Sequence, residues 1–542
     1  MKINIKYIAS MAAITTMLAA GCKKDFFNRP PESGVTVGNY YQTSAQVAAS
    51  TNGLYGEEWF GWNNKGGWAI TELTSGNGRS ASADVDPFST PPVPNNNPWV
   101  LSVWDSPFTV IAQCNGILVN LPTTVPSSVP QSVVNNALGE AHLMRAVAYF
   151  YLVRVFGNVP IVENPLTEIS NFQTVPTNRV VDVYTFMIND LKFAEANCSV
   201  NTASTGHGDS GSASAMLAKV YLYEQDYKDA KAEADKVIAS GEFSLLPNFG
   251  DVFFTINNNS KESILAMQWL YNGGYGFGNS IQASWAPSGV TGGTDGYSVL
   301  GPTIDLQNAF KAEGGDTVRR HYTIMLPGSY YSELDFATGG YTYPITNSAQ
   351  GTDAQPKKYV VGQASDPDNN GKVAYQSAGN NTYIMRYADV LLIDAEASLG
   401  LSSGTTAGHG IPLSASSTDV QYFNMVRARS GVPTVTSFTY QQLLNERRLE
   451  FALEQDYWFD LCRMDGFVPP TWTANGLTAP HPNAEAFIAT QERGQYNNPW
   501  PDQTSISSVK LTFTDAYFLF PVPIDESTTD PALIKAPVPY KF

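Results

Sequence analysis

The sequence predicts a mainly α-helical protein, a helical-repeat scaffold with an irregular, loop-rich region. Two observations lead to this prediction. Apolar residues recur at helical spacing towards both ends of the chain. From residue 244 to about 381 this period mostly fails, and Gly, Asn, Tyr and Thr dominate. Loops this long usually carry function.

Eight segments are expected to be helical because their apolar residues recur every three to four positions. They span residues 44–54, 98–121, 136–156, 180–196, 213–240, 383–399, 418–430 and 440–464. In the third segment, Leu143, Val147 and Phe150 give one apolar face, and Gly157 ends the helix. Tryptophan-rich loops are expected between residues 55 and 98, and a Pro-rich tail after the last helix.

Residues 215–234 resemble a tetratricopeptide helix-turn-helix, in which small residues let two helices approach closely. The small residues are Ala218, Ala230 and Ala234, and the rings of Tyr221 and Tyr227 would fill the space between the helices. A single unit of this kind cannot bury its own face, so neighbouring helix pairs should stack on it. The segment therefore predicts a tetratricopeptide-like helical-repeat scaffold.

Composition excludes two classes of binding partner. Lys and Arg number 32 against 49 Asp and Glu, which gives a formal net charge of -17. Such a chain could not neutralise a run of phosphates, so nucleic-acid binding is not expected. The same balance disfavours electrostatic docking on anionic lipid headgroups.

Residues 1–21 have the pattern of a secretory signal peptide, a basic start followed by an apolar stretch too short to span a bilayer. The stretch ends in Leu18-Ala-Ala-Gly-Cys22, which resembles the lipobox of bacterial lipoproteins, where cleavage precedes a cysteine that receives lipid. Leu18 lies one place further from Cys22 than usual, so a plain signal peptide with a chance cysteine is the alternative. We expect lipidation of Cys22, a tether over residues 22–37 and no transmembrane helix.

Several motifs occur in an order typical of one family. They are Lys23-Lys-Asp-Phe26, Trp104-x3-Phe108-x2-Ile111-x2-Cys114-Asn115, Gly139-Glu-Ala-His-Leu-Met-Arg145-Ala-x2-Tyr149-Phe150, Phe156-Gly-Asn-Val-Pro160, Arg386-Tyr-Ala-Asp389, Asn424-x2-Arg427-Ala-Arg429-x-Gly431, Asn445-Glu-Arg-Arg448, Asp460-Leu-x-Arg463 and Phe520-Pro-Val-Pro-Ile-Asp525-Glu526. Together they resemble the SusD/RagB family of outer-membrane nutrient-binding lipoproteins, nearly end to end. The sequence departs from the family in three places. Gln455 and Tyr457 stand where the family usually has Gly and Arg, and Met464 stands where it often has Trp. Asp530 replaces the usual Asn before Pro531.

The resemblance implies a fold, a location and a partner. Residues 38–243 would form the N-terminal SusD-like helical region, and residues 244–542 the SusD/RagB region with a loop-rich central insertion and C-terminal helices. Family members lie on the outer face of the outer membrane, cap a SusC-type TonB-dependent transporter and capture ligand, most often oligosaccharide. They are binding proteins rather than enzymes, so neither catalytic residues nor a cofactor is expected.

Charged residues on the expected helices have a structural interpretation and a functional one. Glu446, Glu450 and Glu454 recur at i,i+4 and would share one helix face. Three carboxylates in this register could form a cation site or a catalytic cluster. We favour ion pairs across helices, and the expected partners are Arg386, Arg427 and Arg429. His142 and Arg145 are likewise interpreted as contacts between helices.

Enzyme and metal motifs are incomplete. Gly208-Asp-Ser-Gly211 matches the core of a serine-protease nucleophile loop, but a helix should begin at once, with Ser212 or Ser214 as its N-cap. The run 366–371 copies the start of a calcium loop, yet Ser377 holds the position where a bidentate Glu belongs, so a plain turn is favoured. No HExxH, zinc-spaced Cys pair or GxxxxGK motif occurs.

Aromatic residues gather in the two loop-rich regions. Neutral sugars pack their C–H faces on flat rings, while Asn, Asp and Arg side chains bond their hydroxyls. Most tryptophans in such loops nevertheless fill the core. Since family members build their site from the N-terminal loops and the central insertion, the expected stacking platforms are Trp99, Trp285 and Tyr297. The expected polar partners are Arg79, Asp84 and Asn96.

Three functions stay open. The leading one is binding of nutrient oligosaccharides for a SusC-type transporter. The second keeps this scaffold and partner but makes the ligand a peptide or protein, as in the RagB branch. The third, a glycoside hydrolase, needs two carboxylates roughly 5–10 Å apart across a sugar. Its candidate carboxylates are Glu57, Glu58, Glu72, Asp84 and Asp86.

Overall fold

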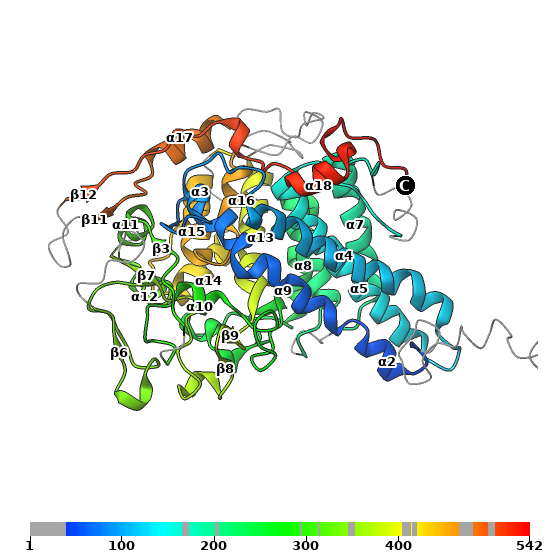
Figure 1. Cartoon of the computed structure of the whole chain (residues 1–542), viewed down its shortest axis with the longest axis horizontal. Helices are drawn as coiled ribbons and strands as arrows, with labels where there is room; N and C mark the ends of the chain where they lie inside the picture. Colours follow the sequence, from blue (N-terminus) through cyan, green and yellow to red (C-terminus); the bar gives the residue numbers. More distant parts are fainter. Residues whose placement is uncertain are drawn as a thin grey trace, which may run out of the picture.

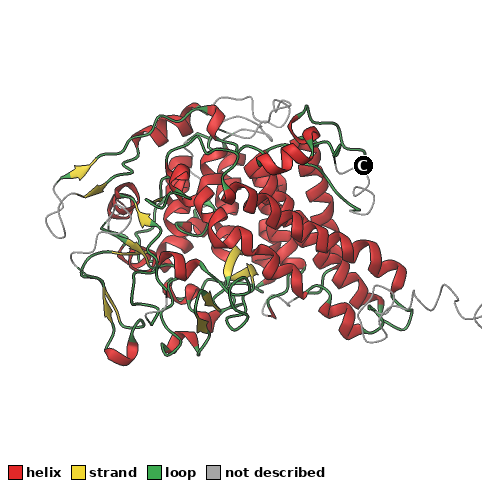
Figure 2. Cartoon of the chain, in the orientation of Figure 1, coloured by secondary structure: helices red, strands yellow, loops and turns green. Residues whose placement is uncertain are grey.

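The computed structural model describes residues 40–164, 173–200, 205–292, 295–312, 315–344, 353–403, 413–414, 420–465, 481–496 and 505–542. Cys22 lies outside the described residues, as do the expected signal peptide and tether. Helices fill the centre of the molecule and one end of it, and most of the short strands lie in the loops towards the other end (Figure 2).

The scaffold is a stack of six long helices. They are α4 (Pro98–Thr124), α5 (Gln131–Phe156), α7 (Val180–Asn197), α8 (Ser210–Tyr223), α9 (Tyr227–Ser240) and α13 (Tyr387–Ser402). Each helix contacts the next in this order, although more than 140 residues separate α9 from α13 in the chain (Figure 1). The predicted mainly α-helical, tetratricopeptide-like scaffold is confirmed.

Close approach of α8, α9 and α13 depends on small residues. Ala218, Ala230 and Ala234 are completely buried, as the repeat signature predicts. Gly400 of α13 lies against the ring of Tyr227, so close that a Cβ at this position would come within 2.4 Å of a ring carbon. A larger residue at Gly400 would push the two helices apart.

Polar contacts tie α4, α5 and α7 together. Arg145 of α5 donates two hydrogen bonds of 2.7 Å to the carboxylate of Asp190 in α7, and a third of 2.8 Å to the side-chain amide oxygen of Asn115 in α4. His142 lies 2.5 Å from the same carboxylate. The interpretation of His142 and Arg145 as contacts between helices is confirmed.

The remaining helices surround this stack or punctuate the loops. They are α2 (Ser44–Ala49), α3 (Asp86–Ser89), α10 (Ile281–Trp285), α11 (Ile304–Ala312), α12 (Thr317–Thr323), α14 (Gln421–Arg429), α15 (Tyr440–Phe451), α16 (Tyr457–Cys462), α17 (Pro482–Thr490) and α18 (Ile524–Thr529). Short helical turns are η2 (Asn52–Tyr55), η3 (Glu57–Trp59), η4 (Trp62–Gly66), η5 (Ala69–Leu73), η8 (Gly250–Phe253), η9 (Thr255–Asn257), η10 (Phe336–Thr338), η11 (Pro367–Asn369), η13 (Asp515–Tyr517) and η14 (Pro531–Ile534).

The strands form antiparallel pairs. The pairs are β1 (Gly78–Arg79) with β3 (Gly301–Pro302), β2 (Ser263–Met267) with β10 (Thr382–Arg386), β4 (Ile324–Met325) with β7 (Gln355–Pro356), β5 (Tyr330–Tyr331) with β6 (Tyr341–Thr342), β8 (Val373–Ala374) with β9 (Ser377–Ala378), and β11 (Gln495–Tyr496) with β12 (Ile506–Ser507). Since β2 and β10 enclose most of the loop-rich insertion between them, their pairing fixes both of its ends against the scaffold.

Four predictions about local structure are wrong. The helix expected from 383 begins as β10, because its first residues pair with β2. The helix expected over 440–464 is broken between α15 and α16, where Leu453 and Gln455 adopt left-handed backbone conformations. The N-cap of α8 is Asp209, whose carboxylate accepts the Ser212 amide hydrogen, while the Ser212 hydroxyl donates to Ile264 of β2.

The fourth concerns the expected tryptophan-rich loop, which contains the nearly continuous helical stretch from η3 to η5. The rings of Trp59, Trp62 and Trp68 are fully buried along it. Wide π-type turns in η4 and η5 accommodate this packing. Burial of three indoles outweighs the poor helix propensity of the Gly and Asn residues between them.

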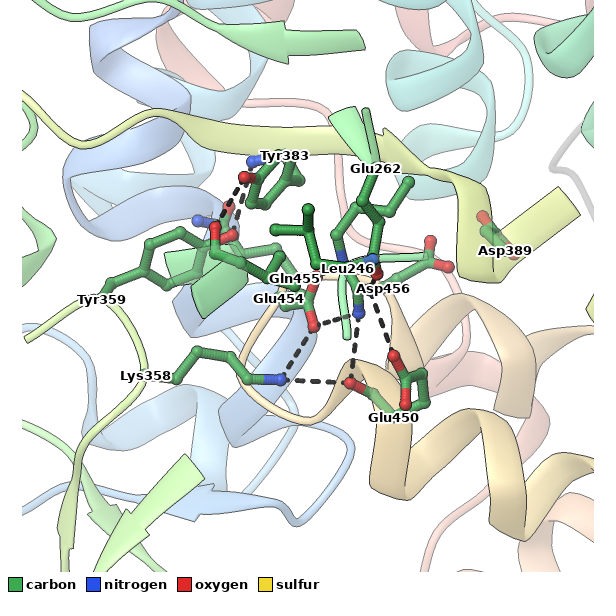
Figure 3. Close-up of polar contacts among 12 residues, drawn as sticks. Leu246, Glu262, Lys358, Tyr359, Tyr383, Asp389, Glu450, Glu454, Gln455 and Asp456 are labelled. Carbon is green, nitrogen blue, oxygen red and sulfur yellow. Dashed lines mark hydrogen bonds and ion pairs between the residues drawn. The ribbon is translucent and has the colours of Figure 1, made fainter. Parts of the chain in front are cut away.

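Glu446 and Glu450 of α15, and Glu454 in the turn that follows it, are all engaged in ion pairs. Glu446 bonds to Arg319 of α12 and Arg427 of α14, Glu450 to Arg386 and Arg429, and Glu454 to Arg386 and Lys358. Figure 3 shows Lys358 reaching both the Glu454 carboxylate and the Glu450 carbonyl, at 2.8 and 3.1 Å. The predicted pairing across helices is confirmed.

These pairs also control ionisation of the central carboxylate. Burial alone would raise the pKa of Glu450, but Arg429, Arg386 and Arg319 lower it to about 2. The carboxylate therefore stays charged at any physiological pH, as buried ion pairs require. Among the described residues, no group of three or more His, Cys, Asp or Glu side chains could hold a metal ion.

Candidate ligand-binding site

A cleft of about 470 Å³ opens where the N-terminal segment meets the loop-rich insertion. We call it the Trp99 cleft, and its lining includes Asn64, Lys65, Trp99, Tyr275, Tyr297 and Gln376. Asn64 and Lys65 lie in η4, Trp99 is in the first turn of α4, and the others come from loops that follow much later in the chain. The helical scaffold is therefore what brings them together.

The indole of Trp99 is held in place by two charged neighbours. Asn97 caps α4 by accepting the Trp99 amide hydrogen, which places the ring at the start of the helix. The indole nitrogen donates to Asp84 at 3.0 Å, and the Lys65 ammonium lies 2.7 Å from Asp84 and 5.3 Å from the centre of the Trp99 ring. Partial burial would raise the pKa of Asp84, but the bonds from Lys65 and Trp99 lower it below its ordinary value.

Three exposed tyrosines surround the cleft, and hydrogen bonds fix each of them. Tyr275, Tyr297 and Tyr375 are 59%, 47% and 56% exposed. The Tyr297 hydroxyl lies 3.0 Å from that of Tyr375 and accepts a 2.7 Å bond from the Gln376 amide. The Tyr275 hydroxyl accepts a 2.8 Å bond from Asn64. Flat rings immobilised in this way lose little conformational freedom when a ligand stacks on them.

The structure unites part of the predicted set. Trp99 and Tyr297 line the cleft, and Asp84 lies beside it through its bond to Trp99. Arg79 is half-buried in β1 and pairs with Gly301, and Asn96 is exposed just before α4; neither lines the cleft.

The prediction that Trp285 is a stacking platform is wrong. Its side chain is 0% exposed at the end of α10, with its ring against the edges of Trp68 and Tyr359. No sugar could reach either ring face. Sequence reasoning missed Tyr375 and Gln376, which form the turn between β8 and β9. Only their position in the loop-rich region could have suggested them.

A second cleft, of about 820 Å³, lies next to this one. Segment 270–278 borders both, contributing Tyr275 to the Trp99 cleft and Leu270, Tyr271 and Phe277 to the second. Side-chain amides make up much of its lining, so we call it the amide cleft; they belong to Asn52, Asn258, Asn259, Gln268, Asn272, Asn370 and Asn381.

Two protein-family models match this chain, and their matches include residues of the scaffold and of both clefts. The model of the SusD family matches residues 261–538, and a model described as "Starch-binding associating with outer membrane" matches residues 76–222. The protein belongs to the SusD family. The two matches fall on either side of the predicted boundary between residues 243 and 244, which stays a prediction.

Relatives of this SusD-family protein cover most or all of it. A SusD-like protein of Bacteroides ovatus is 31% identical over 568 residues, with all of both chains covered. SusD-like protein P2 of Formosa agariphila is 26% identical, covering 83% of this chain and 88% of its own. A crystal structure with xylogluco-oligosaccharide is similar with a TM-score of 0.78 at 29% identity, covering 92% of this chain and 99% of its own.

A laminarin-binding SusD-like protein has the same fold, with a TM-score of 0.65 at 23% identity over 92% of this chain and all of its own. No helix in the described part of this SusD-family chain is both long enough and apolar enough to cross a membrane.

Proposed function

We propose that this SusD-family protein binds neutral oligosaccharides in the Trp99 cleft and delivers them to a SusC-type TonB-dependent transporter. The observation that carries the proposal is the ring of immobilised aromatic side chains, Trp99, Tyr275 and Tyr297, around one open cleft. The crystal structure with xylogluco-oligosaccharide, at 29% identity, supports the same class of ligand.

The chemistry of the cleft favours an uncharged ligand. Its two charged neighbours, Lys65 and Asp84, neutralise one another. The remaining polar groups are amides and hydroxyls, which both donate and accept hydrogen bonds as sugar hydroxyls do. The rings present apolar faces to the C–H side of a pyranose. Asn64 and Gln376 already orient two of the rings and lie within the cleft to meet a ligand.

The proposed location is the outer face of the outer membrane, with the chain anchored by lipid on Cys22. The sequence around Cys22 and the family description that names association with the outer membrane support this. Purification from native membranes in mild detergent should recover the protein with a large β-barrel partner. Recovery of the protein alone under several detergent conditions would count against the transporter partner.

The ligand is tested by calorimetric titration of the lipid-free protein with xylogluco-, laminari- and malto-oligosaccharides and with a peptide pool. We expect heat of binding from at least one oligosaccharide and none from the peptides. Binding of peptides alone would favour the RagB-like alternative.

The hydrolase alternative has little support in the geometry of the Trp99 cleft, which neither Glu57 nor Glu58 lines. Glu72 is completely buried, accepts bonds from Asn77 and from the backbone of Leu453 and Gln455, and cannot touch a sugar. Asp84 is committed to Lys65. The protein is therefore proposed to be a binding protein without catalytic residues or cofactor, and release of reducing ends from a polysaccharide panel would refute this.

A further inference from the structure

The amide cleft has a floor of side chains that hold one another in place. The Asn381 amide donates to Asn259 at 3.0 Å and to Gln268 at 2.8 Å. Asn259 and Gln268 also exchange a reciprocal pair of bonds of 3.1 and 3.0 Å. Asn258 extends this network by accepting the Asn381 backbone hydrogen and donating to the Gly379 carbonyl. A network with this many internal bonds presents its carboxamides in a fixed orientation.

Apolar groups stand beside these amides at the mouth of the cleft. Leu270 and Phe277 are 63% and 38% exposed. A 2.9 Å hydrogen bond from the Leu270 amide to the Phe277 carbonyl closes their loop and holds both side chains at the rim. Trp269 lies deeper, and its indole nitrogen donates to Thr382. Apolar side chains beside a few fixed polar groups are the combination typical of small-molecule binding sites.

The cleft has the character of a site for a neutral polar molecule. Among the described residues that line it, only Glu57, Glu58 and Lys372 are charged, and they are of mixed sign. Two carboxylates beside one ammonium give an anionic ligand no net attraction.

We propose that the amide cleft is a second saccharide-binding site of this protein, separate from the Trp99 cleft. Its carboxamides bond pairs of sugar hydroxyls, and Phe277 and Leu270 cover the C–H face of the ring. Segment 270–278 lines both clefts, so a glycan that stacks on Tyr275 in one can continue past Phe277 into the other. The inference rests on the proposed function for its class of ligand.

The test maps where oligosaccharide slows hydrogen exchange of the backbone in the lipid-free chain. Xylogluco-, laminari- and malto-oligosaccharides are added in turn to the wild type, to Trp99→Ala and to the double variant Asn272→Ala/Phe277→Ala. Asn272 and Phe277 are exposed, so the double variant should fold, which thermal melting verifies. Phe336→Ala is the matched control, because Phe336 is 58% exposed and lines neither cleft.

We expect protection of residues 255–259, 268–272 and 379–381, which border the amide cleft alone, in the wild type, in Trp99→Ala and in Phe336→Ala. The double variant should need about tenfold or more ligand for the same protection, as when one stacked ring is lost. Protection confined to residues around Trp99 and Tyr297 would overturn the second site and leave the proposed function intact. Protection of the amide cleft by a peptide pool but by none of the oligosaccharides would also overturn it, and protection of neither cleft would count against both proposals.

Discussion

Replacement of Gln455 by glycine should stabilise this protein, although the side chain is buried. Gln455 has φ +66 and is 4% exposed, and both polar atoms of its carboxamide lack a hydrogen-bond partner among the described residues. It stands where the family usually has glycine, the residue that adopts this conformation without a steric penalty. The backbone amide would keep its 2.7 Å bond to Glu72 in the variant.

The expected gain follows from the separate contributions of backbone, amide and packing. Relief of the left-handed conformation contributes about 1–2 kcal/mol, and removal of a buried, unsatisfied amide about 1–3 kcal/mol. Loss of two buried methylenes costs about 1.6 kcal/mol, and the freedom of glycine in the unfolded chain costs about 0.5–1 kcal/mol. We therefore expect Gln455→Gly to raise the free energy of unfolding by about 1 kcal/mol.

Two further variants separate these causes when urea unfolding of the lipid-free protein is followed by tryptophan fluorescence. Gln455→Ala removes the amide but keeps a Cβ in the left-handed region, so it should be less stable than Gln455→Gly. Leu453→Gly relieves the same conformation at φ +65 but empties a completely buried apolar site, so it should destabilise by about 2–4 kcal/mol. If Gln455→Gly is no more stable than Gln455→Ala, backbone strain at this position is not a cost and the reasoning fails.

Three shorter predictions concern binding, pH and location. Trp99→Ala should weaken oligosaccharide binding by about 1–3 kcal/mol in calorimetry, and Phe336→Ala should leave it unchanged; equal affinities would place the site elsewhere. The bond from His207 to Glu140 raises the pKa of His207, although partial burial opposes the shift. The charged His207 therefore contributes its full stability below about pH 6.5, and this contribution is lost as pH rises through the folded pKa. Melting temperatures of wild type and His207→Gln should thus differ most in mild acid, and a difference that grows with pH would contradict this. Cys22→Ser should release the protein from membranes without changing its affinity for oligosaccharide. If the variant still fractionates with the outer membrane in cells lacking the transporter, the lipid anchor on Cys22 is refuted.

Sequence patterns predicted the scaffold well because its determinants are local and repeated. The spacing of apolar residues shows which side of a helix is buried. The small residues Ala218, Ala230 and Ala234 and the acidic face of α15 carry the same kind of information. The break after α15 was not predictable in this way, since a Gln fills the position where a glycine would have marked it.

The binding site was only partly predictable, because burial of an aromatic ring is decided by contacts between distant segments. Trp99 and Trp285 look alike as sequence, yet Trp99 opens a helix at the edge of a cleft and Trp285 lies beneath Trp68. The turn at Tyr375 and Gln376 is held at the site by contacts with Tyr297, far away in the chain. No local signal distinguishes such positions.

The ion pairs of α15 have a consequence for how the molecule comes apart. Arg319 and Lys358 belong to the loop-rich insertion, whereas Glu446 lies in α15 and Glu454 in the turn that follows it. If the insertion detached alone, these buried ion pairs would break and the packed surface around them would be exposed to water, which is unfavourable. We therefore expect the site-bearing side to unfold together with the scaffold, so that the clefts persist until the scaffold itself melts.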